Sequence, residues 1–147
     1  LDGTGFNVFV IDSRENYISK IKNKFVNTIL AKDPEIIIKN SPSSSFYLVM
    51  THSHQIDFLI CSALLKINNF SFLGLIGSKT KRVRFSKRLI EIGFNKELID
   101  KIECPIGIDD IIGKEPDIIA ISIIARLLQF KSLANNQVKK YIKLVKV

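Results

Sequence analysis

Short apolar runs alternate with longer amphipathic segments along this chain. Residues 5–11 (GFNVFVI), 46–50 (FYLVM) and 70–76 (FSFLGLI) are apolar over the length of a strand, as expected of parallel strands covered on both faces. Residues 56–67 and 79–92 instead carry apolar residues at helical spacing. The alternation predicts an α/β domain with a mainly parallel sheet flanked by helices.

Weaker patterns occupy the rest of the chain. Residues 26–30 predict a short strand, whereas residues 33–39 fit a strand or a helix equally well. Residues 116–128 are apolar almost all round, which predicts a buried helix beginning near Pro116. The Lys-rich residues 137–147 are compatible with a helix, a strand or a flexible tail.

The strongest chemical pattern follows the apolar run at 70–76. Gly74 and Gly77 allow a tight turn and a close approach of the backbone to a ligand, and Ser78 is a natural N-cap for the next helix. Six cations and no acid follow: Lys79, Lys81, Arg82, Arg84, Lys87 and Arg88. Since a helix N-terminus already carries partial positive charge, this pattern predicts an anion site, with a solvated charged face as the alternative.

The buried side of this cationic helix is predicted from its apolar residues. They are Val83, Phe85, Leu89, Ile90 and Ile92. The preceding turn is not a P-loop, because four residues run from Gly74 to Gly77 where that motif needs six, and it is not a GxGxxG loop.

An acid and a cation follow the first apolar run. In doubly wound sheets an acid at the tip of a strand often holds a ribose hydroxyl, so Asp12 and Arg14 are candidate ligand-binding residues. A turn or a helix cap explains Asp12 alone equally well.

The only two histidines follow the run at 46–50. Thr51, His52 and His54 stand between a strand end and a helix start, where open α/β sheets bind their ligands. A metal site formed by His52, His54 and Asp57 is the less favoured alternative, because the chain has no other histidine to complete it.

The amino-acid composition indicates which kinds of binding partner and which cellular compartment to expect. Lys and Arg number 22 against 14 Asp and Glu, so the net charge of +8 favours anionic partners such as phosphate ligands, nucleic acid or an acidic protein face. Cys61 and Cys104 give neither a disulfide framework nor metal-ligand spacing, which is typical of the cytoplasm. No apolar run approaches the ~18 residues of a membrane helix. We expect one domain, residues 1–134, followed by a basic C-terminal segment, residues 135–147.

Several stretches, in this order and spacing, resemble one protein family. They are VIDSR (10–14), MTHSH (50–54) with Asp57, LGLIGSK (73–79) with Lys81 and Arg82, CPIGI (104–108) and PDIIAISIIA (116–125). Over roughly residues 5–130 the chain resembles the C-terminal Rossmann-like domain of the xanthine dehydrogenase accessory factor (XdhC/CoxF-type) family.

The resemblance implies a cofactor chaperone rather than an enzyme. Such a protein binds the molybdopterin form of the molybdenum cofactor, protects it and delivers it to the apo form of a molybdenum hydroxylase such as xanthine dehydrogenase. The phosphate would lie on the glycine turn and its cations, and the histidines would contact the pterin or an oxo group. The implied cofactor-binding residues are Asp12, Arg14, Thr51, His52, His54, Gly74, Gly77, Ser78, Lys79, Lys81 and Arg82.

One part of the family pattern is missing. The family domain opens with a strand and a glycine-rich turn before the segment equivalent to Gly5 and Phe6, and this chain has neither. That strand would be central in the sheet. We therefore expect that the chain is a fragment, or that another chain or a rearrangement fills the gap. Exposed strand edges would favour a homodimer.

Two other function classes compete with the chaperone. A NAD(P)-linked oxidoreductase or nucleotide-sensing domain fits Asp12 at a strand tip, but the absent GxGxxG counts against it. A nucleic-acid-binding domain is suggested by charge alone, without a binding motif or interleaved aromatic residues. The chaperone is the preferred interpretation.

Overall fold

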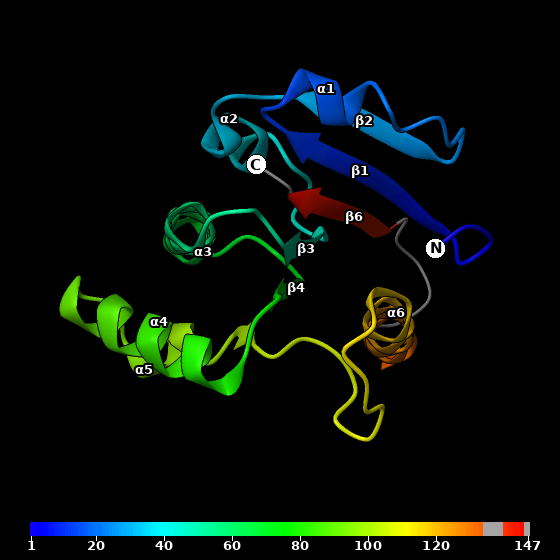
Figure 1. Cartoon of the computed structure of the whole chain (residues 1–147). Coiled ribbons are helices and arrows are strands. Elements are labelled where there is room, and N and C mark those ends of the chain that lie inside the picture. The colour runs from blue at the N-terminus through cyan, green and yellow to red at the C-terminus, as the bar shows by residue number, and fades with distance from the viewer. Residues whose placement is uncertain (134–139, 146–147) are drawn as a thin grey trace.

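A six-stranded parallel sheet forms the centre of the protein (Figure 1), in a computed structural model that describes residues 1–133 and 140–145. Every strand pair is parallel, and the strand order is β2-β1-β6-β3-β4-β5. The strands are β1 (Phe6–Asp12), β2 (Val26–Leu30), β3 (Phe46–Val49), β4 (Phe72–Leu75), β5 (Ile102–Glu103) and β6 (Lys140–Val145). The predicted α/β class with a parallel sheet is confirmed.

Helices cover both faces of the sheet. They are α1 (Glu15–Ile18), α2 (Pro34–Lys39), α3 (His54–Ile67), α4 (Lys79–Glu91), α5 (Lys96–Ile99) and α6 (Pro116–Leu133). The ambiguous residues 33–39 form α2, because Asp33 caps the helix by accepting a hydrogen bond from the Glu35 amide.

Alternate side chains of the central strands point to opposite faces of the sheet, where they pack in two separate hydrophobic cores. Tyr47 and Val49 of β3 pack with α3 and α4 in the larger core, whereas Phe46 and Leu48 pack against α6 in the smaller one. All four residues of β3 are therefore buried, which explains why its sequence is continuously apolar rather than alternating.

The place of the expected missing strand is filled from the same chain. β6 lies between β1 and β3, with Phe6 in register with Lys140 on one side and Phe46 in register with Ile142 on the other. Residues 140–145, which the sequence set apart from the domain at 1–134, thus complete its sheet. Residues 134–139 and 146–147 lie outside the described residues.

The central strand carries a buried lysine. Lys143 stands in register between Phe9 and Tyr47 and is only 7% exposed. Its ammonium lies 5.3 Å from the centroid of the Phe9 ring and forms no ion pair with a described residue. Burial accordingly lowers the pKa of Lys143.

The predicted buried side of α4 is partly wrong. Val83, Ile90 and Ile92 are 68%, 58% and 56% exposed. The residues that α4 buries are Lys81, Phe85 and Leu89. Because 3.6 residues make one turn, this four-residue spacing places Val83 and Ile90 on the opposite, outward side.

α6 is likewise covered on one side only, contrary to the prediction of a helix buried all round. Ile123 and Leu127 pack in the smaller core, whereas Ile121 is 56% exposed and Leu128 is 37% exposed.

Candidate functional site

The carboxyl ends of β1, β3 and β4 meet at one edge of the sheet. The segments that leave them carry the polar residues singled out in the sequence. The β1 and β3 ends lie at the same edge because β6 pairs in parallel with both strands and lies between them. The β3 and β4 ends are joined by a hydrogen bond from the Ile76 amide to the Val49 carbonyl, 3.0 Å long. The residues that the sequence predicted to line a crevice therefore come from three strand ends at this edge of the sheet.

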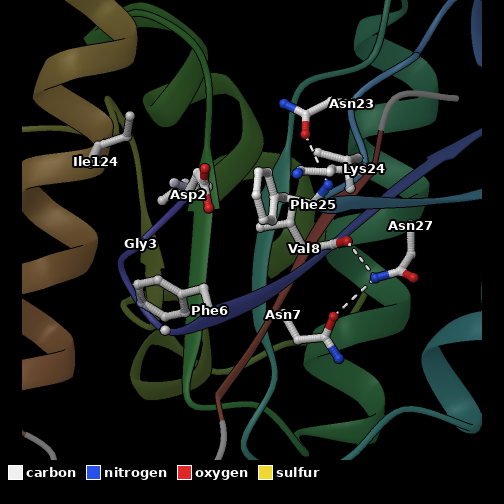
Figure 2. A pocket seen from close by; sticks show the side chains of 13 residues that line it. Asp2, Gly3, Phe6, Asn7, Val8, Asn23, Lys24, Phe25, Asn27 and Ile124 are labelled. Carbon is white, nitrogen blue, oxygen red and sulfur yellow. Dashed lines mark hydrogen bonds between the residues drawn. The ribbon is translucent and has the colours of Figure 1, made fainter.

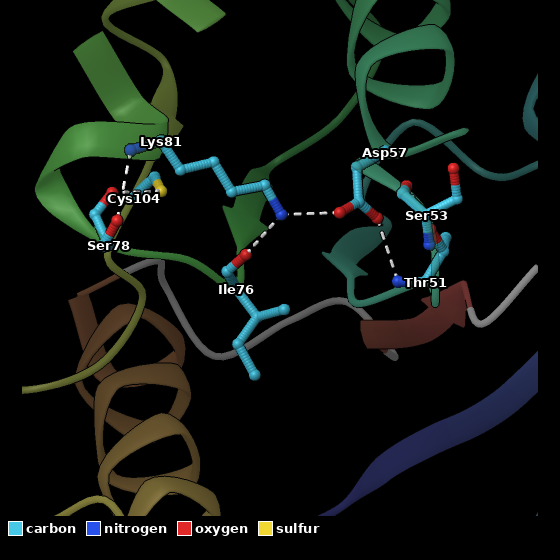
Figure 3. A network of polar contacts seen from close by, with 7 residues as sticks. All are labelled: Thr51, Ser53, Asp57, Ile76, Ser78, Lys81 and Cys104. Atoms are coloured by element: carbon cyan, nitrogen blue, oxygen red, sulfur yellow. Dashed lines mark hydrogen bonds and ion pairs between the residues drawn. The ribbon is translucent and has the colours of Figure 1, made fainter. Parts of the chain in front are cut away.

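A buried ion pair connects the segments after β3 and β4 (Figure 3). Lys81 Nζ lies 2.6 Å from Asp57 Oδ2, and the two side chains are 9% and 1% exposed. The same ammonium donates to the Ile76 carbonyl at 2.8 Å, and Asp57 Oδ1 accepts the Thr51 amide at 2.9 Å. One acid from α3 and one cation from α4 thus fix the backbone of both loops.

Because of this ion pair, the Lys81 ammonium points into the protein. The sequence assigned Lys81 to the anion site, but its ammonium is directed inward to Asp57 and Ile76. A Cβ on Gly77 would lie 2.4 Å from Lys81 Cδ, so Gly77 has a packing role beneath the lysine stem. The pairing was missed because nothing in the sequence marks which of six cations points inward.

The start of α4 matches the prediction. Ser78 caps the helix, its hydroxyl accepting the Lys81 amide at 3.2 Å, while its carbonyl accepts the Arg82 amide at 3.0 Å. Lys79 is exposed. Arg82 Nη2 donates to Asp100 at 3.3 Å, whereas its Nη1 is buried and has no hydrogen-bond partner among the described residues.

Gly74 does not take part in the turn that was predicted for it. It lies inside β4, where a Cβ would come within 2.1 Å of Ile106 Cδ1 and 2.9 Å of Phe72 Cε1. The glycine is needed for packing of the segment after β5 against the sheet.

Asp12 and Arg14 bind each other. Asp12 Oδ1 accepts the amide and Nε of Arg14, both at 2.9 Å, and Oδ2 accepts Nη2 at 2.8 Å. These bonds lower the pKa of Asp12, and the guanidinium also lies 4.0 Å from the centroid of the Tyr17 ring. Both carboxylate oxygens are therefore already hydrogen-bonded within the loop.

The histidine loop is ordered by a threonine. Thr51 Oγ1 donates to the Ser53 carbonyl at 2.8 Å and accepts the Ser53 amide at 3.1 Å, which leaves His52 and His54 exposed. No group of three possible metal ligands occurs among the described residues. The alternative metal site also loses its third ligand, because Asp57 is paired with Lys81.

The CPIG segment contacts the residue that caps α4, a contact that the sequence did not reveal. Cys104 Sγ lies 3.9 Å from the Ser78 carbonyl, and burial raises the pKa of this thiol. Ser122 of α6 holds the segment by accepting the Ile108 amide at 2.8 Å.

Two hollows flank the smaller core. One, of about 500 Å³, is apolar, and Met50 and Ile76 line it together with α6. The other, of about 660 Å³, lies at the amino-terminal end of β1 and β2, away from the crevice (Figure 2). There Asn27 Nδ2 donates to Asn7 Oδ1 at 2.9 Å and to the Val8 carbonyl at 3.1 Å.

Comparison with known proteins places these features in a family. A profile described as the XdhC Rossmann domain matches residues 1–127. A crystal structure of a xanthine dehydrogenase from Bacillus halodurans is similar, with a TM-score of 0.70 and 27% sequence identity over 89% of this chain. The match covers only 37% of that protein. No curated protein matches the chain. Among the described residues, no helix combines the length and the apolar character that crossing a membrane requires.

Proposed function

This chain belongs to the XdhC Rossmann-domain family, and from that premise we propose that it binds the molybdopterin form of the molybdenum cofactor for a xanthine dehydrogenase-type hydroxylase. In this proposal it is a chaperone module without turnover of its own. It holds the cofactor in the crevice and releases it to the apo-hydroxylase, and it acts in the cytoplasm, alone or as a homodimer.

The start of α4 carries the proposal. Among its first four amides, those of Lys81 and Arg82 are bonded to Ser78, whereas those of Lys79 and Thr80 have no hydrogen bond to a described residue. Free amides at a helix N-terminus attract a phosphate, and molybdopterin carries one.

Side chains beside these amides fit the same anion. The exposed ammonium of Lys79 and the unpartnered Nη1 of Arg82 lie on the first turn of α4 and supply positive charge. His52 and His54 are exposed and would contact the pterin, and Arg14 would line the crevice from the β1 end. Bound there, the cofactor supplies the redox-active molybdenum for the hydroxylase, and the protein supplies only retention and orientation.

The NAD(P)-linked alternative has weaker support. A dinucleotide-binding domain uses a strand-tip acid to bind the ribose, but Arg14 already occupies both oxygens of Asp12. The turn at Gly77 also lacks the GxGxxG spacing.

Cofactor retention tests the proposal. Protein purified without denaturation from a host that makes molybdopterin is expected to carry oxidisable pterin and molybdenum. Replacing Lys79 and Arg82 by Ala should reduce the pterin content at least tenfold, because two charge-assisted contacts to the phosphate are lost. Oxidised-pterin fluorescence and metal analysis measure both quantities.

The matched control is Arg84→Ala with Lys87→Ala. It removes two exposed cations from the same helix, beyond the first turn, and should retain the pterin content of the parent. Equal pterin in the Lys79/Arg82 variant and the parent, with unchanged far-UV circular dichroism, would contradict the proposed site.

A further inference from the structure

One edge of the sheet has a strand without a second partner. β2 is the outermost strand, and among the described residues it pairs only with β1. Its pairing is regular over Val26–Leu30, and this stretch contains neither a charged residue nor a proline. Natural proteins commonly protect an edge strand with such residues or with a bulge. The outer side of β2 is therefore open to pairing with another strand.

A hydrogen bond to the end of β1 shows which backbone groups of β2 face outward. The amide of Ala31, directly after β2, donates to the Asp12 carbonyl at 3.1 Å. Because successive residues of a strand direct their amide and carbonyl groups to opposite sides, the odd-numbered residues of β2 also face β1. The even-numbered residues Val26, Thr28 and Leu30 then face outward. The amides of Thr28 and Leu30 are thus left without a partner in the described part of the chain.

Apolar side chains lie at both ends of this edge. Phe25 and Leu30 are 49% and 51% exposed. Tyr17 of α1 and Ile36 of α2 are more than half exposed, and these two helices directly precede and follow β2 in the chain. Figure 1 shows α1 and β2 together at one margin of the molecule. The edge combines unpaired backbone groups with exposed apolar side chains, which is typical of a protein–protein interface.

We propose that β2 pairs in antiparallel orientation with β2 of a second copy of the protein, so that the two sheets become one continuous sheet. The outward residues are symmetric about Thr28, so a two-fold axis at Thr28 places each outward residue opposite another outward residue. The two Thr28 residues then exchange backbone hydrogen bonds, and the Leu30 amide of each copy donates to the Val26 carbonyl of the other.

The same register also matches the side chains. Val26 of one copy lies opposite Leu30 of the other, and Phe25 lies opposite Ala31, so both cross-strand pairs are apolar. Because the joined strands run in opposite directions, the carboxyl ends of the two sheets lie at opposite edges of the dimer. Both copies of the predicted cofactor site stay accessible. The inference goes beyond the proposed function and does not depend on it.

A proline at the two-fold axis tests the pairing. Thr28→Pro removes an outward amide and leaves the bonds to β1 in place, because an edge strand tolerates proline where its N–H would face solvent. In sedimentation velocity at micromolar concentration the parent is expected to be a dimer. Thr28→Pro should raise the dissociation constant roughly tenfold or more, since the central hydrogen bonds are lost. Thr28→Val is the matched control, which keeps the amide and should stay dimeric.

Two lysines that flank β2 test the register. Lys24 and Lys32 are equally far from Thr28 along the chain, so Lys24 of each copy lies beside Lys32 of the other. These like charges oppose the contact, and raising NaCl from about 50 mM to about 500 mM should therefore tighten the dimer. Lys24→Glu should tighten it as well, because opposite charges then face each other. A dimer that either change weakens would overturn the proposed register.

Hydrogen exchange provides a second measurement, made on the parent itself. The amides of Thr28 and Leu30 should be protected at concentrations where the dimer forms and should exchange rapidly in the diluted monomer. A monomeric parent, a dimer in which both amides exchange rapidly, or a Thr28→Pro dimer as tight as that of the parent would overturn the proposal. Pterin content should be equal in the parent and in Thr28→Pro, because Thr28 lies outside the predicted cofactor set. Absence of pterin in both samples concerns only the proposed function.

Discussion

Replacing Asp57 by Asn, or Lys81 by Met, is expected to lower the free energy of unfolding by about 3–5 kcal/mol, because each change leaves a buried charge without its partner. The two side chains are 1% and 9% exposed, and their charged atoms are 2.6 Å apart. The loss is a large share of the stability of a domain of this size, ~5–15 kcal/mol. Urea denaturation followed by circular dichroism measures it.

The double variant separates pairing from burial. Asp57→Asn combined with Lys81→Met removes both charges and should lose less than the sum of the single losses, which gives a coupling energy of about 0.5–3 kcal/mol. Glu35 and Lys39 supply the control, since this exposed pair is 3.8 Å apart and its Ala variants should change stability by less than ~1 kcal/mol. The proposal would be contradicted if each single variant lowered the free energy of unfolding by less than ~1 kcal/mol and the double variant lost only the sum of the two. That result would show that the Asp57–Lys81 pair does not hold the two loops.

Replacing Lys143 by Met should have the opposite sign. Met retains the unbranched stem and removes an amine that is buried in the centre of the sheet without an ion pair to a described residue. We expect the free energy of unfolding to rise by about 1–3 kcal/mol. The matched control is Lys39→Met, whose side chain is 64% exposed and should change stability by less than ~0.5 kcal/mol.

The pH dependence of stability tests the same lysine. Burial lowers the pKa of Lys143 in the folded chain below its ordinary 10.5, so in the interval between the two values the unfolded chain binds more protons. The free energy of unfolding therefore rises as pH increases from the lowered pKa of the folded chain to about 10.5, and it falls again when pH is lowered through the same interval. Lys143→Met should flatten this slope; a slope equal to that of the parent would rule out burial of the amine.

The sequence predicted those helices and strands that are marked by a signal within a few neighbouring residues, such as a helix cap or an apolar run. The Ser78 cap located the start of α4, and the continuous apolar run located β3. Several short motifs in one order also identified the family, which the profile match over residues 1–127 confirms.

What could not be predicted depends on contacts between distant segments. The Lys-rich residues 140–145 have no strand pattern of their own, and only their pairing with β1 and β3 makes them the central strand. Similarly, the inward direction of Lys81 depends on Asp57 in another helix. The ligand-binding roles of Asp12, His52, His54, Lys79 and Arg82 stay predictions.

The position of β6 has a consequence for the way the chain folds. Phe6 pairs with Lys140, so the middle of the sheet cannot close until nearly the whole described chain has been synthesised. Until then β1 and β3 each present an unpaired edge, which is a site for aggregation. Pairing over such a sequence separation is also slow, since loop closure precedes the energetic gain. We therefore expect refolding to be limited by insertion of the last strand, and chains lacking residues 140–145 to depend on chaperones or to precipitate.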